Sequence, residues 1–288
     1  MIFSAAQKIP GFLLGDLANL SVLLPPQQPQ AVAHHQQGGS HVGGDGQPQG
    51  GGTQQGEKNE EKLCIFEFIY FGRPDSIMKG QSLYMSRKRA GKILYREFPA
   101  EADFVCSVPD SGTPSAIGFS EASGIPFLEG LVKNRYVGRT FIKPSQSQRE
   151  IGVALKLNVL EEVVRGKSIV LVDDSIVRGT TIKKLISRLR DCGAGEIHLR
   201  ISAPPVMWPC FFGIDTPSRD ELLGARFSVE EIGRLVGADS IGYLSLEGLV
   251  EATSRSGFCT GCFSGQYPVD IEGADGRYTL DTDQKVRT

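Results

Sequence analysis

Two adjacent carboxylates, Asp173 and Asp174, stand between an apolar run and a short loop. The run, residues 169–172, is typical of a buried parallel strand. The loop ends in Gly-Thr-Thr at residues 179–181, and apolar residues one turn apart over 182–189 predict a helix behind it. Glycine, two hydroxyls and a helix N-terminus suit a phosphate group. The sequence therefore predicts a strand, an anion-binding loop and a helix.

The two carboxylates need a separate explanation, because they would repel a phosphate. They fit such a site only if they bind hydroxyl groups of the ligand or a magnesium ion that offsets their charge. The alternative is that Asp173 and Asp174 only end a strand at the solvent, which is the more frequent case for an isolated pair.

A second strand, loop and helix precede the first. Residues 103–108 form an apolar run, residues 109–112 follow it, and Pro114 suits the first helical position with Thr113 as the cap. Alone, this loop would be an ordinary turn. Since α/β sheets gather ligands at the carboxyl ends of their strands, two such loops together predict one binding site.

A basic segment follows a third predicted strand, residues 126–132. Residues 133–139 hold one lysine, two arginines and a tyrosine beside Gly138. These side chains suit a mobile flap that closes on a polyanion and excludes water. The alternative is a solvated basic loop.

The six cysteines are widely scattered, which favours thiol or metal chemistry over a disulfide framework. Cys259 and Cys262 have the C-x-x-C spacing with which two thiolates reach one metal. This spacing leaves structural zinc, an iron–sulfur cluster and a redox pair open. Cys106 in an apolar strand and Cys192 at the end of an amphipathic helix are predicted core residues. The remaining candidate ligands are Cys64 and Cys210.

The stretch from Val172 to Thr181 resembles the phosphoribosyl-pyrophosphate (PRPP) motif of the type I phosphoribosyltransferases, and residues from about 64 to about 268 resemble the amidophosphoribosyltransferase family. The resemblance implies that the aspartates hold the ribose hydroxyls, the loop after them the 5-phosphate, and the earlier loop the pyrophosphate. The residues implied to bind PRPP are Pro109, Asp110, Ser111, Gly112, Asp173, Asp174, Ser175, Arg178, Gly179, Thr180 and Thr181.

The same resemblance implies metal sites and a catalytic loop. Magnesium would be bound by Ser111, Asp173 and Asp174. The residues of the flexible loop implied to be catalytic are Lys133, Tyr136 and Arg139. A [4Fe–4S] cluster, as in one branch of the family, would be held by Cys64, Cys210, Cys259 and Cys262 and would tie the start, middle and end of the domain together.

The implied reaction belongs to purine nucleotide biosynthesis: ammonia displaces pyrophosphate from PRPP and gives 5-phosphoribosylamine. The family also implies purine-nucleotide inhibitors and a homo-oligomer. Its glutaminase domain uses an N-terminal cysteine, and no cysteine precedes Cys64 here, so we expect no glutamine hydrolysis from this chain alone. The alternatives are a non-catalytic PRPP- or nucleotide-binding fragment and a salvage phosphoribosyltransferase acting on a nucleobase.

Composition and patterning set the remaining expectations. The net charge of −2 gives no electrostatic reason to expect nucleic acid or an anionic membrane as partner, and no apolar run approaches the roughly 18 residues of a membrane span. We expect the protein to be located in the cytoplasm, or in the plastid stroma if the natural N-terminus carries a transit peptide. Residues 1–61 are predicted to be disordered, because Gln, Gly, Pro and His dominate residues 27–55.

Residues 62–270 are predicted to form the phosphoribosyltransferase domain and residues 271–288 a polar tail. The fold class is α/β, a mainly parallel sheet flanked by helices. Further predicted elements are a strand at 64–71, a helix at 86–94 whose Arg87, Lys88, Arg89 and Lys92 form a solvated face, a strand at 196–202, and a helix capped by Ser228 with Glu231.

Overall fold

The structure, a computed structural model, describes residues 62–134, 157–214, 216, 218–269 and 271. Residues 1–61, all but the first residue of the predicted tail, and Tyr136 and Arg139 of the predicted flexible loop lie outside the described residues. The three domain limits therefore stay a prediction. No helix in the described part of the chain has the length and apolar character that crossing a membrane requires.

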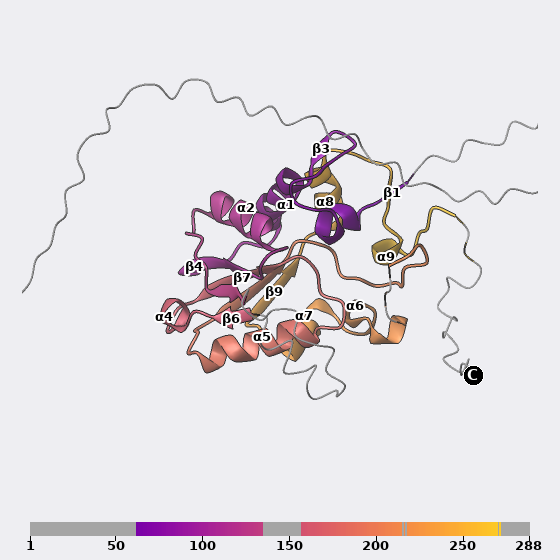
Figure 1. The fold of residues 1–288 in the computed structure, drawn as a ribbon. Coiled ribbons are helices and arrows are strands. Elements are labelled where there is room, and N and C mark those ends of the chain that lie inside the picture. The colour runs from indigo at the N-terminus through magenta and orange to yellow at the C-terminus, as the bar shows by residue number, and fades with distance from the viewer. Residues whose placement is uncertain (1–61, 135–156, 215, 217, 270, 272–288) are drawn as a thin grey trace, which may run out of the picture. The chain divides into compact units, whose positions relative to one another are not determined.

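A sheet of four parallel strands forms the centre of the fold, in the order β4-β7-β8-β9 (Figure 1). The strands are β4 (Phe104–Ser107), β7 (Ile169–Asp173), β8 (Ile197–Ile201) and β9 (Ser240–Tyr243). Strands β4 and β7 show the continuous apolar runs expected of strands covered on both faces. The predicted parallel sheet and the predicted strands 103–108 and 196–202 are confirmed.

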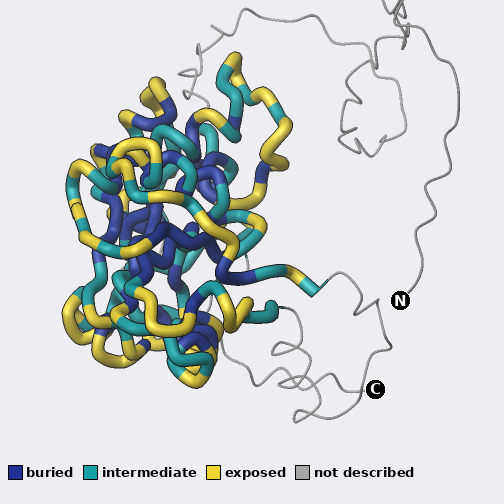
Figure 2. Tube along the Cα trace, turned by 90° about the vertical axis from the view of Figure 1, so that its left-hand side faces the viewer, coloured by how far each residue is buried: buried dark blue, intermediate teal, exposed yellow. Residues whose placement is uncertain are grey.

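Helices cover both faces of the sheet (Figure 1). On one side lie α1 (Leu83–Glu97), α2 (Thr113–Ser123) and α8 (Leu246–Thr253), and on the other α5 (Thr180–Asp191) and α7 (Val229–Val236). Side chains of β7 alternate between two cores: Val170 and Val172 pack with the first group, Ile169 and Leu171 with the second. Figure 2 shows the buried residues inside and the exposed residues outside.

Short elements surround this framework. They are β1 (Leu63–Cys64) paired with β10 (Phe258–Cys259), β2 (Ile77–Met78) with β3 (Gln81–Ser82), β5 (Leu131–Lys133) with β6 (Leu157–Val159), the turns η1 (Glu67–Phe71) and η2 (Arg219–Glu221), and the helices α4 (Glu161–Val164), α6 (Leu223–Arg226) and α9 (Gly261–Ser264). The predicted capping box is confirmed, since Ser228 and Glu231 bond each other's backbone N–H groups at the start of α7.

Three sequence predictions need correction. The strand predicted at 64–71 is wrong: β1 ends at Cys64 and a π-helical turn, η1, follows. The strand predicted at 126–132 is interrupted, because Phe127 bridges Val105 of β4 whereas β5 begins only at Leu131. Both segments contribute residues to the core, such as Phe68 and Leu131, but a short apolar run does not reveal its local conformation.

The third correction concerns the basic face of α1. Arg87, predicted to be solvated, is only 3% exposed. Its guanidinium group donates hydrogen bonds to backbone carbonyls of η1 and Gly72. Lys92 is exposed, and its ammonium group lies 2.9 Å from Glu121 of α2, so this part of the prediction is confirmed.

Candidate functional site

The loops that follow β4 and β7 lie side by side. The N–H of Val108 donates to the carbonyl of Val172 at 2.8 Å. A Cβ atom on Gly112 would lie 2.7 Å from that same carbonyl oxygen, so only glycine lets the first loop pack so closely on the end of β7. The chain after β4 bridges one edge of that strand at Phe127, and β7 pairs with the other. Ligands of α/β proteins bind at such reversals of strand order.

The predicted carboxylate pair lies at this reversal. Asp174 is buried, with 7% of its surface exposed, and its N–H donates to Asp173 Oδ1 at 2.9 Å. Two hydroxyls donate to its carboxylate, that of Ser175 at 2.5 Å and that of Ser111 from the first loop. The structure therefore brings Ser111 and both aspartates together, as the sequence predicted.

Burial changes the acidity of both carboxyls. It raises the pKa of Asp173 well above the usual range, and the neighbouring carboxylate of Asp174 raises it further. The pKa of Asp174 is also raised by burial, but the hydroxyls of Ser111 and Ser175 and the charge of Arg87 act against this shift. Such a pair binds a proton, a metal ion or a hydroxyl donor more readily than two solvated aspartates do.

The second loop forms the wall of a cavity of about 410 Å³, lined by Asp173 and by residues 175–182. Gly179 has φ +71° and is the N-cap of α5, so its backbone takes the left-handed conformation that opens the loop at the helix N-terminus. Thr180 and Thr181 are exposed there. The backbone N–H groups, hydroxyls and helix dipole predicted for a phosphate therefore meet at one cavity.

Contacts from another segment hold this loop. Arg178 Nε lies 2.9 Å from Glu221 Oε2 of η2, and the N–H of Leu223 donates to the carbonyl of Val177 at 3.0 Å. Nothing in the sequence pattern marked Glu221 or Leu223, because both lie about 40 residues from the loop.

Lys133 is the part of the predicted catalytic loop that the structure describes. It ends β5, and its ammonium group lies 2.6 Å from Asp110 Oδ2 in the first loop. Both side chains are at least half exposed. Lys133 is thus placed within reach of the predicted pyrophosphate loop, whereas Tyr136 and Arg139 lie outside the described residues.

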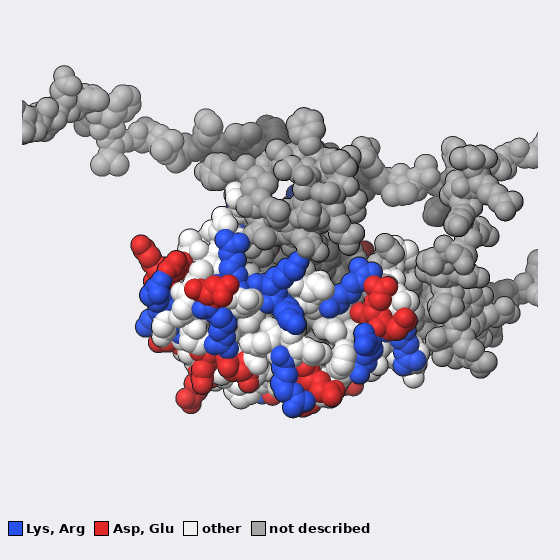
Figure 3. All heavy atoms as spheres, turned by 90° about the horizontal axis from the view of Figure 1, so that it is seen from below, with Lys and Arg blue, Asp and Glu red and all other residues white. Residues whose placement is uncertain are grey.

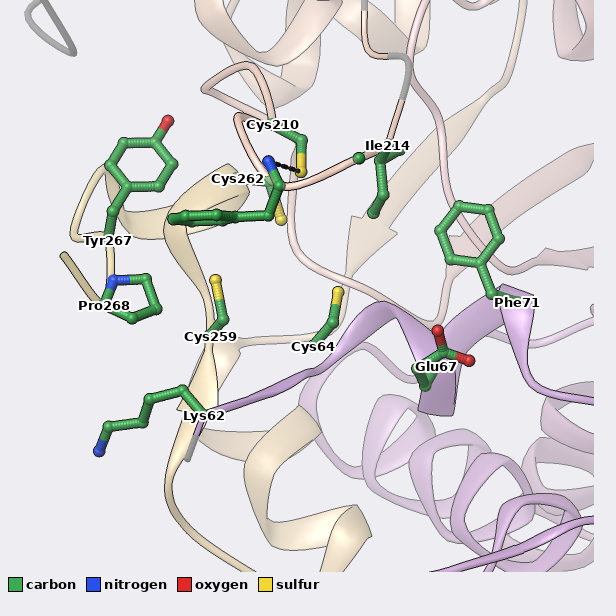
Figure 4. A pocket seen from close by; sticks show the side chains of 12 residues that line it. Lys62, Cys64, Glu67, Phe71, Cys210, Ile214, Cys259, Cys262, Tyr267 and Pro268 are labelled. Atoms are coloured by element: carbon green, nitrogen blue, oxygen red, sulfur yellow. Dashed lines mark hydrogen bonds between the residues drawn. The ribbon is translucent and has the colours of Figure 1, made fainter. Parts of the chain in front are cut away.

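A second cavity, of about 780 Å³, lies where three segments that are distant in the sequence meet. The thiols that line it are Cys64 in β1, Cys210, Cys259 in β10 and Cys262 in α9, and their sulfur atoms point into the same space (Figure 4). Cys64 and Cys259 are partners in the β1–β10 ladder, and the N–H of Phe212 donates to Cys210 Sγ at 3.4 Å. The four predicted thiols are therefore brought together.

The other two cysteines lie away from this cavity. Cys106 is buried in β4, as predicted for a core residue, and burial raises the pKa of its thiol to about 11. Within the thiol cavity, burial first and the neighbouring thiols next raise the pKa of Cys262 to about 12. Among the described residues, no three His, Cys, Asp or Glu side chains stand close enough to hold a metal ion. The four thiols thus line one cavity without being arranged around a single ion.

Comparisons with known proteins agree with this architecture. The sequence profile of the phosphoribosyl transferase domain matches residues 75–203. An amidophosphoribosyltransferase of Synechococcus elongatus is 58% identical over 217 residues, which are 75% of this chain and 44% of that protein. One of Archaeoglobus fulgidus is 56% identical over 223 residues, 76% of this chain and 49% of that protein. The chain spans about half the length of these curated relatives or somewhat less.

Solved structures show the same relationship. The glutamine PRPP amidotransferase of B. subtilis, solved in complex with ADP and GMP, superposes with a TM-score of 0.67 at 50% identity, covering 73% of this chain and 48% of that one. A structure described as the allosteric regulatory enzyme of purine biosynthesis gives the same TM-score and identity, and the match covers 73% of this chain and 46% of that one. The described part of this chain therefore has the type I phosphoribosyltransferase fold, and the chain belongs to the amidophosphoribosyltransferase family.

Proposed function

We propose that this domain transfers the 5-phosphoribosyl group of PRPP to ammonia, with release of pyrophosphate, as a step of purine nucleotide biosynthesis. The observation that carries the proposal is the meeting of two loops and a buried carboxylate pair at the reversal between β4 and β7. Relatives that are 50–58% identical are named amidophosphoribosyltransferase, which supports this reaction over nucleobase salvage.

Each part of the site has a task in this reaction. The cavity at residues 175–182 would bind the 5-phosphate through backbone N–H groups and the hydroxyls of Thr180 and Thr181. Asp173 and Asp174 would accept hydrogen bonds from the ribose hydroxyls. The first loop, with Lys133 beside it, would bind the pyrophosphate, so the ribose C1 would be held between the two loops.

The C1–O bond to pyrophosphate breaks and pyrophosphate leaves with the electron pair. Ammonia forms the new C1–N bond and loses a proton to water. Lys133, together with Tyr136 and Arg139, would stabilise the negative charge that develops on pyrophosphate. The chain's own residues thus orient the reactants and the leaving group, and no general base is required when the nucleophile is free ammonia.

Magnesium fits the carboxylate pair. Asp173, Asp174 and the hydroxyl of Ser111 supply the oxygen ligands that Mg²⁺ prefers, and such ions usually take their other ligands from substrate phosphates and water. The ion would neutralise charge on the departing pyrophosphate. This would also relieve the repulsion that two aspartates impose on PRPP.

The thiol cavity fits a [4Fe–4S] cluster better than zinc. A zinc ion holds its sulfur ligands about 2.3 Å away and so needs them in mutual contact, whereas no three of these side chains are arranged to hold one ion. Four thiols around a cavity of about 780 Å³ suit a larger cofactor with four thiolate ligands. Because the proposed reaction transfers no electrons, the cluster would stabilise the fold and take no part in redox chemistry.

Further partners follow from the same relationship. The B. subtilis structure contains ADP and GMP, so we propose purine nucleotides as ligands of this domain and a homo-oligomer as its assembly. Figure 3 shows positive and negative side chains interspersed on the face around α5 and α7, which does not offer the one-signed surface that nucleic acids bind. The proposed domain comprises residues 62–270.

The test is pyrophosphate release by anaerobically purified protein supplied with PRPP and Mg²⁺, with ammonium salt in one sample and glutamine in another. We expect release with ammonium. The Asp174→Asn variant should lose it, and the control variant Asp191→Asn, at the exposed far end of α5, should keep it. Folded protein that releases no pyrophosphate in either sample would overturn the proposed transferase activity.

A further inference from the structure

Arg87 of α1 carries a buried positive charge. Its Nε donates to the carbonyl of Phe68 at 2.9 Å, and its Nη2 donates to the carbonyls of Gly72 at 2.6 Å and Glu67 at 3.2 Å. These carbonyls hold the guanidinium group in one orientation without cancelling its charge. A fully buried ion normally needs an opposite charge nearby, because the removal of an ion from water is strongly unfavourable.

The opposite charge lies at the carboxyl end of β7. Arg87 lines a small cavity of about 10 Å³ together with Ser115 and Ser202. The N–H of Ser202 donates to the carbonyl of Asp173 at 3.0 Å, and the hydroxyl of Ser115, in the first turns of α2, donates to the carbonyl of Arg87 at 3.0 Å. Arg87 is therefore packed behind both loops, on the side of the aspartates that faces the core.

Within the described part of the chain, no ion pair involves Asp173 or Asp174. The hydrogen-bond donors to Asp174 described above are the hydroxyls of Ser111 and Ser175, which carry no net charge. The attraction between Asp174 and Arg87 acts on both groups: it opposes the effect of burial on the pKa of each. Lys133, the nearest basic residue of the predicted flap that is described, pairs with Asp110 instead.

We propose that Arg87 is a positioning residue of the PRPP site, whose buried charge offsets the carboxylate of Asp174 from behind and so reduces the repulsion of a polyanionic ligand by the aspartate pair. This inference rests on the proposed function. PRPP keeps a net negative charge when Mg²⁺ is bound to it, and it must approach two aspartates. A cation fixed behind them lowers that barrier without occupying ligand space, since hydrogen bonds to the carbonyls of Phe68 and Gly72 keep it there.

The test compares three variants for PRPP dependence and stability. Arg87→Met removes the charge, and Arg87→Lys keeps it but loses the planar fork. Arg200→Met is the matched control, because Arg200 of β8 is 5% exposed and also donates to backbone carbonyls, those of Phe98, Pro99 and Leu199. Burial lowers the pKa of its guanidinium group to about 10, and no aspartate of the described residues acts against this shift.

We expect Arg87→Met to raise the KM for PRPP about tenfold, with a smaller change in kcat, and Arg87→Lys to restore KM to within about threefold of the unmodified protein. Arg200→Met should lower the urea midpoint while leaving KM unchanged. If Arg87→Met does not fold, Arg87→Gln, which keeps an amide donor, takes its place in the comparison.

Two results would overturn the role of Arg87: a KM for the neutral variant equal to that of Arg200→Met, or a KM for Arg87→Lys as high as that of the neutral variant. Failure of the unmodified protein to bind PRPP in a direct titration with Mg²⁺ would instead contradict the proposed function. The two failures are therefore distinguishable in one set of measurements.

Discussion

Gly179 offers a direct test of the phosphate loop, through substitution by alanine. Its φ of +71° lies in the left-handed region, where a side chain costs about 1–2 kcal/mol. The new Cβ atom would also lie 2.4 Å from Leu223 Cδ1, and moving that side chain off its rotamer costs about 0.5–1.5 kcal/mol. We therefore expect a loss of roughly 1.5–3.5 kcal/mol in the free energy of unfolding.

Gly166 provides a matched control within the same domain. Its φ is also +71°, and a Cβ atom there meets nothing within 4 Å. Gly166→Ala should therefore lose only the backbone cost, about 1–2 kcal/mol. Urea unfolding of both variants measures the difference, and for a domain of this size each kcal/mol corresponds to about 2–4 °C in Tm.

Binding should separate the two variants further. Leu223 holds the carbonyl of Val177 through its N–H, so a displaced Leu223 disturbs the loop that lines the 410 Å³ cavity. We expect Gly179→Ala to weaken PRPP binding at least about tenfold and Gly166→Ala to leave it within about twofold. Equal losses of stability and affinity in both variants, or unchanged affinity in Gly179→Ala, would refute the assignment of this loop to a phosphate.

Three further predictions concern other parts of the domain. A carboxyl whose folded-state pKa is raised stabilises the fold below its unfolded pKa, about 3.9, and this stabilisation is lost as the pH rises through the folded value. Asp173→Asn should therefore raise the urea midpoint of the ligand-free protein at pH 7.5, by an amount that shrinks towards pH 4, and should abolish the further stabilisation by Mg²⁺ and PRPP. Ser228→Ala should cost about 1 kcal/mol of stability in urea unfolding with no change in PRPP affinity, because the capping box at α7 lies outside the candidate site. Removal of iron by a chelator under anaerobic conditions should bleach any cluster absorbance and speed hydrogen exchange in residues 207–214 without changing exchange in β7; equal exchange before and after bleaching would contradict a structural role for the cluster.

The central part of the fold could be predicted from sequence because its signals are local. A strand buried on both faces must be apolar throughout, and a helix over a sheet must repeat its apolar residues every turn, so β7 and α5 were identified with their loop. The parallel pairing then places the ends of β4 and β7 at the same edge of the sheet. The position of the candidate site follows from those two facts.

The errors arose where distant contacts decide the conformation. Residues 67–71 contain the aromatic and isoleucine side chains of a strand, yet they coil into η1, whose carbonyls at Glu67 and Phe68 accept hydrogen bonds from Arg87, about 20 residues away. Arg87 itself lies in a run of basic residues, a pattern that is typical of a solvated helix face. A one-dimensional pattern records the charge of a side chain but not the acceptors that remove it from water.

The proposed cluster would join three distant segments at the thiol cavity, and contacts within the protein already join some of them. A ladder of two residues, β1 with β10, is too short to hold two remote segments. Aromatic pairs add to it: the rings of Phe66 and Phe263 stack at 5.4 Å, and those of Phe68 and Phe258 meet edge-on at 5.4 Å.

The middle segment is held differently. The N–H groups of Met207 and Trp208 both donate to the carbonyl of Cys262, at 2.9 and 3.0 Å, and the chain then passes Cys210 to the exposed Phe212. The stretch that carries Cys210 is also held by Tyr267, whose hydroxyl donates to the carbonyl of Pro209 at 2.8 Å and whose ring meets that of Phe211 edge-on at 5.1 Å. Phe211 and Phe212 are nevertheless exposed, whereas the strands of the sheet are largely buried, so the loss of a cluster bound by all four cysteines should loosen residues 207–214 before it affects the sheet.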